Sequence, residues 1–318
     1  MSMIETKKAS RRKLSAPDVS LIIPTYNEKA NIAPLVEAVR SALGDIPWEI
    51  IIVDDDSPDQ TFAEVSRLAR DEPRLRCLRR VGRRGLSSAV IEGALVANGS
   101  AIAVMDADFQ HDERILKQMY EKLTSTGADI VVATRYAEGG GIGEWDATRA
   151  KMSDFATRMA GMLVGNQTSD PMSGFFMVRR EIFASVIYDL SQQGYKILLD
   201  IISSSHTPLK IEEVPYVFRT RQEGESKISV MVLAQFLFLI IEKLTHGLIP
   251  PRFALFSIVG GFGLLVHLAI LNGLKLAGFT FIAAQLTATF IAMMSNFVMN
   301  NEFTYRDRRL TGLSFLAG

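Results

Sequence analysis

The chain has 318 residues, of which 48% are hydrophobic and 22% are charged, and its 35 Lys and Arg balance 35 Asp and Glu. This length accommodates two domains, and zero net charge excludes the overall basic field expected of a nucleic-acid-binding protein. The mean hydropathy of +0.16 is high for so many charges, which indicates that a charged domain is joined to a nearly uncharged stretch.

Residues 1–17 predict a flexible, basic, solvated tail. The segment is polar and lacks the apolar core of a signal peptide. Its basic residues are Lys7, Lys8, Arg11, Arg12 and Lys13, which on a membrane protein would also attract anionic lipid.

Residues 18–227 predict an α/β domain in which strands and helices alternate. The expected strands are Val19–Pro24, Ile50–Val53, Ala101–Met105 and Ile130–Ala133, and the expected helices are about 31–43, 60–70, 87–97 and 112–126. This alternation predicts a Rossmann-like, mostly parallel sheet. In such sheets, ligands bind at the carboxyl ends of the strands.

Three polar clusters follow expected strands, namely PTYNE at 24–28, DDDS at 54–57 and DAD at 106–108. Acidic clusters at one sheet edge would repel one another without a cation, and Asp108 with the amide of Gln110 offers the oxygen ligands of a hard divalent ion. A single Asp-x-Asp is weak evidence, because most acidic loops are only solvated. Three clusters in order are more specific.

A strongly apolar stretch, 228–250, follows the α/β domain and ends at two prolines. It carries Gln235, Glu242, Lys243 and His246, so it predicts an amphipathic helix in the membrane interface. A buried core helix is the alternative.

Residues 251–318 predict a membrane domain with two transmembrane helices, about 253–275 and 279–299. No Asp, Glu, Lys or Arg occurs from Phe253 to Leu274 or from Leu276 to Asn301, and each run exceeds the roughly 20 residues that span a bilayer. The alternative is a hairpin buried in a soluble core, but soluble helices normally show a polar stripe.

The flanking charges predict a multi-pass protein of the cell membrane with its α/β domain in the cytoplasm. Arg252 precedes the first span and Arg306, Arg308 and Arg309 follow the second, whereas the connecting turn carries only Lys275. The single cysteine, Cys77, excludes an internal disulfide and agrees with a reducing compartment. The apolar end, TGLSFLAG, predicts that the natural chain continues past Gly318.

Seven motifs occur in the order IIPTYNE, VDDDSPDQT, GLSSAV, VMDADFQH, DPMSGFF, GYKILLD and GESKIS. In this order they resemble glycosyltransferase family 2, and within it the dolichol-phosphate (polyprenol-phosphate) mannose synthase branch. The resemblance covers about residues 19–230 and implies a GT-A fold. The segment from Arg252 onward resembles a truncated GtrA-like membrane domain, which usually has four spans where two are present here.

The resemblance also implies site residues. The nucleoside pocket would comprise Pro24, Tyr26, Glu28, Val53, Asp54 and Asp55, with Met105 and Ala107 contributing backbone. Catalytic roles fall to Asp106, Asp108, Arg135, Arg221 and Lys227, which would also bind substrate, and Asp108 and Gln110 would ligate Mg²⁺ or Mn²⁺. Arg84 is a further substrate contact on the diphosphate, and Arg149 one in the acceptor loop.

The implied reaction is inverting transfer of mannose from GDP-mannose to a polyprenyl (dolichyl-type) phosphate at the cytoplasmic membrane face. A lipid phosphate is already an anion, so its attack on the sugar needs no strong general base. Arginine forks and lysine charges suit the phosphates of both substrates. Direct displacement at the anomeric carbon inverts its configuration.

Three alternatives remain open. A UDP-glucose-dependent polyprenyl-phosphate glucosyltransferase would carry similar motifs. A processive polysaccharide synthase should carry the motif Gln-x-x-Arg-Trp, but neither Trp48 nor Trp145 is preceded by Gln-x-x-Arg. A non-catalytic translocase component is disfavoured, because Asp108 and Arg221 are both present.

Six residues and one glycine segment keep open roles. His111 is expected in a supporting or surface position rather than as a ligand, and His267 lies in the first span without an identified partner. Asp200 stands where relatives carry Glu and is left out of the site. Gly139–Gly141 predicts a mobile loop over the acceptor, and Asn296, Asn300 and Asn301 predict hydrogen bonds between membrane helices.

Overall fold

The computed structural model describes residues 16–141, 157–161, 163–165, 167–191, 194, 196–219, 240, 245, 251–304 and 310. The chain divides into two compact units, Met1–Phe236 and Leu237–Gly318. Most of the predicted basic tail and of the predicted interface helix lies outside the described residues.

The first unit contains a seven-stranded sheet with the order β3-β2-β1-β4-β6-β5-β7. The strands are β1 (Val19–Thr25), β2 (Trp48–Asp54), β3 (Leu75–Arg79), β4 (Ala101–Val104), β5 (Ile130–Thr134), β6 (Phe176–Arg179) and β7 (Ile211–Pro215). Of these described strands, only β6 runs antiparallel to its neighbours, β4 and β5. The predicted α/β class with a mostly parallel sheet is therefore confirmed.

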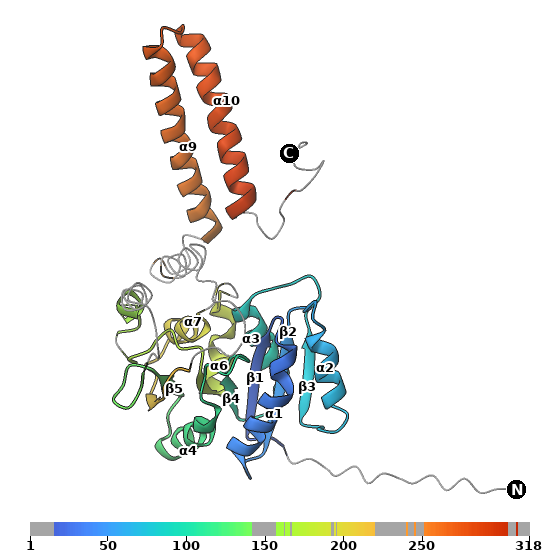
Figure 1. The fold of residues 1–318 in the computed structure, drawn as a ribbon. Coiled ribbons are helices and arrows are strands. Elements are labelled where there is room, and N and C mark those ends of the chain that lie inside the picture. The colour runs from blue at the N-terminus through green and yellow to red at the C-terminus, as the bar shows by residue number, and fades with distance from the viewer. Residues whose placement is uncertain are drawn as a thin grey trace, which may run out of the picture. The chain divides into compact units, whose positions relative to one another are not determined.

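Helices cover both faces of this sheet (Figure 1). They are α1 (Lys29–Leu43), α2 (Thr61–Leu68), α3 (Leu86–Val96), α4 (Leu116–Thr126), α6 (Arg180–Val186) and α7 (Ile197–Ser204). A turn of 3₁₀ helix, Glu113–Ile115, leads into α4, and another, Ile187–Asp189, follows α6. Helix α1 contacts both α2 and α4, α6 contacts α7, and α3 contacts α7.

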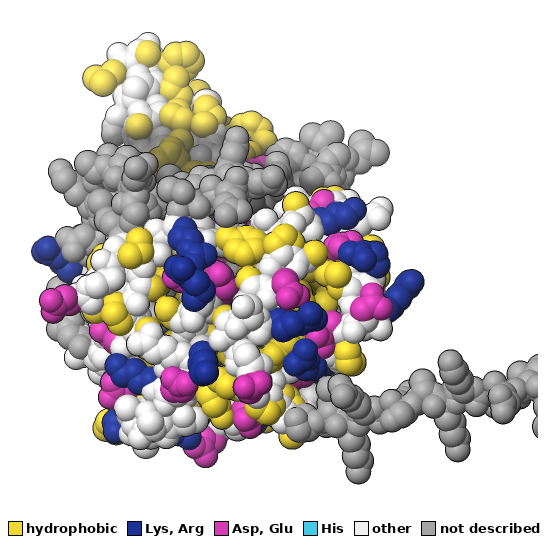
Figure 2. Space-filling model, turned by 60° about the horizontal axis from the view of Figure 1, so that its bottom comes forward, with side chains coloured by type: hydrophobic (Ala, Val, Ile, Leu, Met, Phe, Trp, Pro, Cys, Tyr) yellow, Lys and Arg dark blue, Asp and Glu magenta, His cyan; other side chains and the backbone are white. Residues whose placement is uncertain are grey.

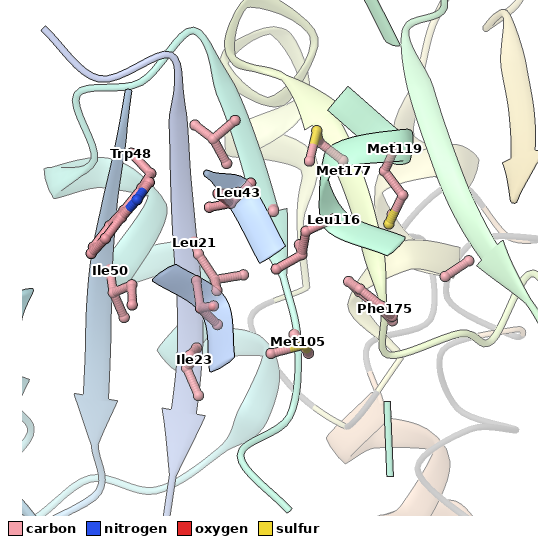
Figure 3. Close-up of a cluster of buried hydrophobic side chains, with 14 of the residues drawn as sticks. Leu21, Ile23, Leu43, Trp48, Ile50, Met105, Leu116, Met119, Phe175 and Met177 are labelled. Atoms are coloured by element: carbon pink, nitrogen blue, oxygen red, sulfur yellow. The ribbon is translucent and has the colours of Figure 1, made fainter. Parts of the chain in front are cut away.

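The core lies between the sheet and helices α1 and α4 (Figure 3). Alternate residues of the central strands, such as Leu21 and Ile23, point to this face and pack near Leu43, Leu116 and Phe175. All five are at most 1% exposed. Because successive strand residues point to opposite faces, the intervening Ile22 is left for the other helix layer.

Gly93 lets α3 approach the sheet closely. A Cβ atom at this position would lie 2.5 Å from Ile22 Cγ2 and 2.9 Å from Val53 Cγ2. Both side chains are fully buried, so neither has space into which it can move. Val53, which was expected in the nucleoside pocket, has its side chain in this helix–sheet contact, and only its backbone remains for a ligand.

Replacing Gly93 by alanine should therefore destabilise the first unit by about 1–3 kcal/mol, because overpacking forces strain on buried neighbours. Thermal unfolding of the detergent-solubilised chain measures the effect. Leu95→Ala is the matched control on the same helix, since Leu95 is 63% exposed. Equal midpoints for the two variants would contradict the close approach of α3.

The second unit contains α9 (Pro251–Leu276) and α10 (Phe281–Met299), followed by a π-helical turn at Asn300–Thr304. The helices form a hairpin whose turn includes Gly278 with φ of 85°. The Thr280 side chain accepts a bond from the Ala283 amide and so caps α10. Ala284, Ala288 and Ala292 are buried at successive turns of α10, which lets the helices approach closely.

Both helices of the second unit are long and apolar enough to cross a membrane, over Leu255–Leu276 and Phe281–Glu302. Only 11% and 17% of their most apolar windows are buried, which disfavours a hairpin at the core of a soluble protein. Figure 2 shows hydrophobic side chains over this hairpin, whereas positive and negative side chains alternate over the visible face of the first unit.

The structure describes contacts for two of the three asparagines that were expected to form hydrogen bonds between membrane helices. Asn301 exchanges two hydrogen bonds with the backbone of Leu310, at 2.8 and 3.1 Å. Asn296 lies against Gly263 of α9, but its Oδ1 has no hydrogen-bond partner within the described part of the chain.

Candidate active site

The predicted polar clusters meet at one edge of the sheet. Strands β2, β1 and β4 are neighbours and parallel, with Pro24 opposite Val53 and Ile22 opposite Val104. Their carboxyl ends therefore place Tyr26, Asp55 and Asp106 at the same edge. Each loop there contains a residue with positive φ, namely Asn27 (62°), Asp56 (55°) and Phe109 (59°). Such backbone strain is concentrated at functional sites.

Asp54 supports the loop that follows β2. Its carboxylate is fully buried and accepts hydrogen bonds from the Ser57 amide (3.1 Å), the Ser57 hydroxyl (2.5 Å) and the Thr25 hydroxyl (3.2 Å). These bonds tie the loop after β1 to the loop after β2. Asp54, which was expected beside the nucleoside, thus shapes the pocket from within.

Asp55 connects the same loop to the start of α3. It accepts a bond from the Gly85 amide (2.8 Å) and forms an ion pair with Arg80 Nη1 (2.9 Å). Burial raises the pKa of Asp55, against the opposing effects of Gly85 and Arg80. Arg80 is itself 1% exposed and donates to the Gly85 carbonyl (2.9 Å) and the Ser88 hydroxyl (2.6 Å). Sequence reasoning missed this buried arginine.

The Arg84 guanidinium lies over the Tyr26 ring, 4.2 Å from its centre. Tyr26 is 41% exposed, so the stacked pair of Tyr26 and Arg84 is accessible to solvent. Its neighbour Glu28 accepts a bond from the Asn31 side chain (2.6 Å), at the start of α1. The structure thus brings together three predicted residues, Tyr26, Asp55 and Arg84.

The Asp106–Asp108 turn follows β4 directly. Met105 and Ala107 are buried, at 1% and 3% exposure, whereas the Asp106 side chain is 38% exposed. The carboxylate of the buried Asp108 accepts a hydrogen bond from the backbone amide of Gln110 (3.1 Å), and Phe109 between them has a left-handed backbone conformation. Gln110 in turn donates through Nε2 to the Arg219 carbonyl (3.4 Å).

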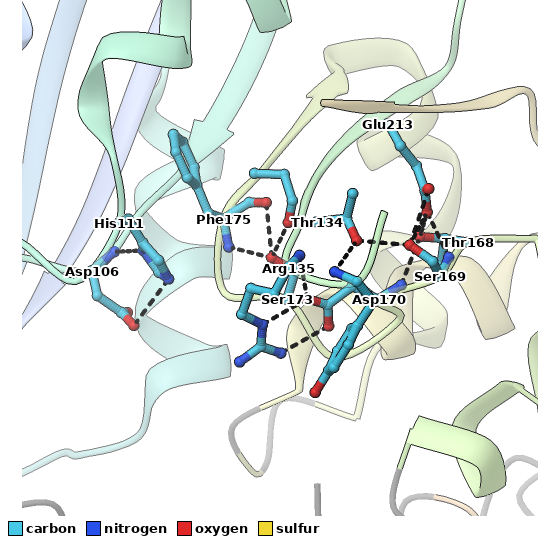
Figure 4. A network of polar contacts seen from close by, with 12 residues as sticks. Asp106, His111, Thr134, Arg135, Thr168, Ser169, Asp170, Ser173, Phe175 and Glu213 are labelled. Carbon is cyan, nitrogen blue, oxygen red and sulfur yellow. Dashed lines mark hydrogen bonds and ion pairs between the residues drawn. The ribbon is translucent and has the colours of Figure 1, made fainter. Parts of the chain in front are cut away.

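Both ring nitrogens of His111 lie close to Asp106 (Figure 4). The Asp106 amide donates to His111 Nδ1 (3.2 Å), and His111 Nε2 lies 4.0 Å from Asp106 Oδ2. The imidazole is 4% exposed and stacks on Phe175 at 5.3 Å between ring centres. Because Nδ1 accepts, we assign the proton of the neutral ring to Nε2. The surface position that the sequence left open for His111 is therefore wrong.

Arg135 follows β5 and pairs with Asp170 through two parallel hydrogen bonds (Figure 4). Nε lies 2.7 Å from Oδ2 and Nη2 lies 2.8 Å from Oδ1, and Asp170 is fully buried. Burial alone would lower the pKa of Arg135, but the hydrogen bonds and charge of Asp170 outweigh it and raise that pKa. The Nε–Nη2 edge of the Arg135 guanidinium, which was predicted to bind substrate, is thus paired with Asp170.

Asp170 is held by a hydroxyl-rich loop before β6 (Figure 4). Thr168 donates to Glu213 on β7 (2.6 Å), the Thr134 and Ser169 hydroxyls share a bond (2.7 Å), and Ser173 donates to the Ala133 carbonyl (2.7 Å). The motif DPMSGFF had flagged this loop, but the sequence assigned no role to Asp170.

Two residues of the GYKILLD motif take different positions. Lys196 is half-buried at the start of α7, where burial and then the charge of Arg135 lower its pKa. The sequence analysis did not single out Lys196. Asp200 is buried and accepts a bond from the Ser191 amide (2.9 Å), which anchors the segment before α7.

Gly141, at the end of the predicted mobile loop, pairs with the segment after β7. Its amide donates to the Tyr216 carbonyl (3.2 Å) and its carbonyl accepts from the Phe218 amide (2.9 Å). Arg149, Arg221 and Lys227 lie outside the described residues, so their roles remain predictions.

The Asp106–Gln110 turn fits a shared cation site rather than a closed cage. Among the described residues, no group of three His, Cys, Asp or Glu side chains is arranged to hold a metal ion. The turn instead offers carboxylate and amide oxygens, with Asp106 partly exposed. These are the ligands of hard divalent cations, which commonly take their remaining oxygens from substrate phosphates and water.

The mostly parallel sheet with acidic clusters at its carboxyl edge defines an α/β protein whose candidate site lies where such folds bind their ligands. The model of the family "Glycosyl transferase family 2" matches residues 20–187, and that of "GtrA/DPMS, transmembrane domain" matches residues 255–317. The chain therefore belongs to glycosyltransferase family 2, is a glycosyltransferase, and carries a membrane domain.

Curated relatives extend this similarity over most of the chain. A dolichol-phosphate mannosyltransferase of Pyrococcus furiosus is 35% identical over 92% of this chain and 82% of its own length. An enzyme of the same name from Saccharomyces cerevisiae is 37% identical over 69% of this chain and 84% of its own.

Solved structures support the GT-A fold. Glucosyl-3-phosphoglycerate synthase of Mycobacterium tuberculosis, in complex with Mn²⁺, UDP and glucosyl-3-phosphoglycerate, matches with a TM-score of 0.54. It is 18% identical, over 73% of this chain and 80% of the other. At this identity the likeness shows the fold alone.

Asp170→Asn should destabilise the first unit by about 3–5 kcal/mol, because it leaves the Arg135 charge buried without its counter-ion. Thermal unfolding of the solubilised chain measures the loss. Asp189→Asn is the control, since it weakens an exposed pair with His206. A loss no greater than that of the control would contradict the buried pair.

His111 should make stability depend on pH. Burial lowers the pKa of His111 from 6.5 to about 4, so between these values the unfolded chain binds a proton that the folded chain does not. Stability should fall as the pH falls from 6.5 toward 4, by up to about 3 kcal/mol from this group. His111→Phe keeps an aromatic ring at this position but removes the titrating group. Its thermal midpoint, measured in EDTA, should therefore fall less steeply as the pH is lowered. Equal slopes for the two proteins would contradict the neutral, buried imidazole.

Proposed function

We propose that the protein transfers mannose from GDP-mannose to a polyprenyl phosphate of the dolichyl type, releasing GDP and forming polyprenyl-phosphate mannose. The similarity to two dolichol-phosphate mannosyltransferases carries the proposal, because each is at least 35% identical to this chain over most of its own length. The loops of this chain that would bind a nucleotide sugar meet at the carboxyl edge of the sheet, which agrees with that function.

The nucleotide would bind over the loops after β1 and β2. Tyr26 with the stacked Arg84 offers an aromatic face and a positive charge, and Asp55 offers a carboxylate fixed by Arg80 and Gly85. Pro24, Glu28, Val53 and Asp54 complete the proposed pocket from the same two loops, partly through backbone.

The diphosphate would lie over the turn after β4. Asp108 and Gln110 would hold Mg²⁺ or Mn²⁺ there, and the bound cation would neutralise charge on the departing diphosphate. The synthase of M. tuberculosis was crystallised with Mn²⁺ and UDP, which supports a divalent cation in this position. Met105 and Ala107 shape the turn from beneath, and Asp106 would face the sugar.

The acceptor phosphate would be held by arginine and lysine. Arg135 is oriented by Asp170, and we place Arg149, Arg221 and Lys227 around the two phosphates. Because the acceptor is already an anion, these residues need only bring it to the anomeric carbon. Displacement of GDP from the opposite face would invert that carbon.

The membrane unit would keep the enzyme at its lipid substrate. We propose a multi-pass cell-membrane protein with its catalytic unit in the cytoplasm, because Arg252, Arg306, Arg308 and Arg309 flank the hairpin on one side. The amphipathic stretch at 228–250 would lie in the interface next to the catalytic domain, which we place at 18–227.

Glucose transfer from UDP-glucose remains the second candidate, because the M. tuberculosis synthase that shares this fold was crystallised with UDP-glucose. A donor panel distinguishes the two. We expect the purified protein to release nucleoside diphosphate from GDP-mannose, in the presence of Mg²⁺ or Mn²⁺, only when polyprenyl phosphate is added. Lipid-dependent release from UDP-glucose but not from GDP-mannose would favour the second candidate. If lipid phosphate does not stimulate release from either donor, both candidates are excluded.

Asp108→Ala should lower this rate by about 10²–10³-fold, the scale on which loss of one charge-stabilising group acts. EDTA should abolish the wild-type activity, and Mg²⁺ or Mn²⁺ should restore it. Glu121→Gln is the control, because Glu121 is an exposed carboxylate on α4 that pairs with Lys117. An unchanged rate in Asp108→Ala would refute the metal assignment.

A further inference from the structure

Arg219 joins two parts of the proposed site through its backbone. Its amide donates to the Gln110 carbonyl (2.9 Å), and Gln110 Nε2 donates to the Arg219 carbonyl (3.4 Å). Arg219 stands four residues beyond the end of β7. Because β7 and β4 run in the same direction, this segment leaves the sheet at the edge where the Asp106–Gln110 turn lies.

The Arg219 side chain grips the same turn a second time. Nη1 lies 3.0 Å from Glu113 Oε2, and Nη2 lies 2.5 Å from Asp112 Oδ1. The two carboxylates are mostly buried, at 11% and 14% side-chain exposure. A planar guanidinium fixes the distance between two carboxylates, which a lysine ammonium does not.

The charge of Arg219 matters at this place. Residues 106–113 carry four carboxylates, and the donor diphosphate that would bind there is also an anion. Arg219 offsets the two carboxylates behind the turn. Asp112 keeps a second partner, since Arg114 Nη2 lies 2.6 Å from its Oδ2.

We propose that Arg219 is a positioning residue that fixes Gln110 and the turn after β4, so that the binding of a cation, and of the diphosphate that shares it, depends on the contacts of Arg219. The inference rests on the function proposed above for Gln110. None of the seven motifs includes Arg219, and its role follows from its contacts with the Gln110–Glu113 segment.

The test measures Mn²⁺ binding to the full-length, detergent-solubilised protein by electron paramagnetic resonance, with and without GDP. In Arg219→Gln we expect the Mn²⁺ dissociation constant with GDP to rise about 10-fold, as when the partner of a metal ligand is lost. Arg114→Gln is the matched control, because it also removes a pair with Asp112 but does not touch Gln110. We expect a change below about 2-fold there, and an intermediate value for Arg219→Lys, since its single ammonium pairs with fewer oxygens.

A second variant guards against a folding defect. Glu113→Gln weakens the same grip from the other side and should raise the dissociation constant about 3-fold, with its thermal midpoint near that of the wild type. In both variants GDP should enhance Mn²⁺ binding less than in the wild type, which a loss of stability alone would not cause.

The outcomes separate the two proposals. Wild-type values in Arg219→Gln, or in Glu113→Gln if Arg219→Gln does not fold, would overturn the role of Arg219 while the proposed function stands. Equal effects in Arg219→Gln and Arg114→Gln would also overturn it. A wild-type protein that binds neither Mn²⁺ nor GDP would overturn both.

Discussion

The parallel alignment of the strands is the constraint on which the site depends. Strands β1, β2, β4, β5 and β7 all end at one edge, so residues from 26 to 219 meet there although they are far apart in the chain. Even the antiparallel strand contributes. Because β6 runs the other way, its preceding loop arrives at the same edge and delivers Asp170 to Arg135. The sheet therefore brings to one edge residues from the connections after β1, β2, β4 and β7 and from both ends of the connection between β5 and β6.

Arginine–carboxylate pairs then fix the loops that the sheet has gathered. Arg80 holds Asp55, Asp170 holds Arg135, and Arg219 holds the turn after β4. Removing such charges from water is costly, so buried pairs add little net stability. Their geometry is specific, however, since a guanidinium fork accepts a carboxylate in few orientations. We interpret the pairs as devices that keep a site for anionic phosphates in shape before either substrate arrives.

The sequence predicted the elements whose pattern is local and failed where the pattern is set by distant partners. The strands that became β1, β2, β4 and β5 are apolar runs, and their order implied the parallel sheet. Strand β3 (LRCLR) and strand β7 (IEEVP) carry charges, so neither is a clear apolar run. Strand β6 (FMVR) begins inside the DPMSGFF motif and was not predicted as a strand. Tyr26 and Asp106 were found because their motifs follow strands. Asp170 and Arg80 were missed, because their importance comes from partners 35 and 25 residues away.

The zero net charge of the chain is an average over two units with different solvents. Acidic and basic residues alternate over the visible face of the catalytic unit, whereas the hairpin exposes side chains such as Phe256, Leu265 and Ile282. The proposed reaction needs both, because a nucleotide sugar is soluble in water and a polyprenyl phosphate is confined to the bilayer. Joining the two units in one chain holds the catalytic site at a high effective concentration relative to the lipid. In the proposed reaction the acceptor would reach the site by diffusing in the membrane plane, and only the donor would have to be captured from solution.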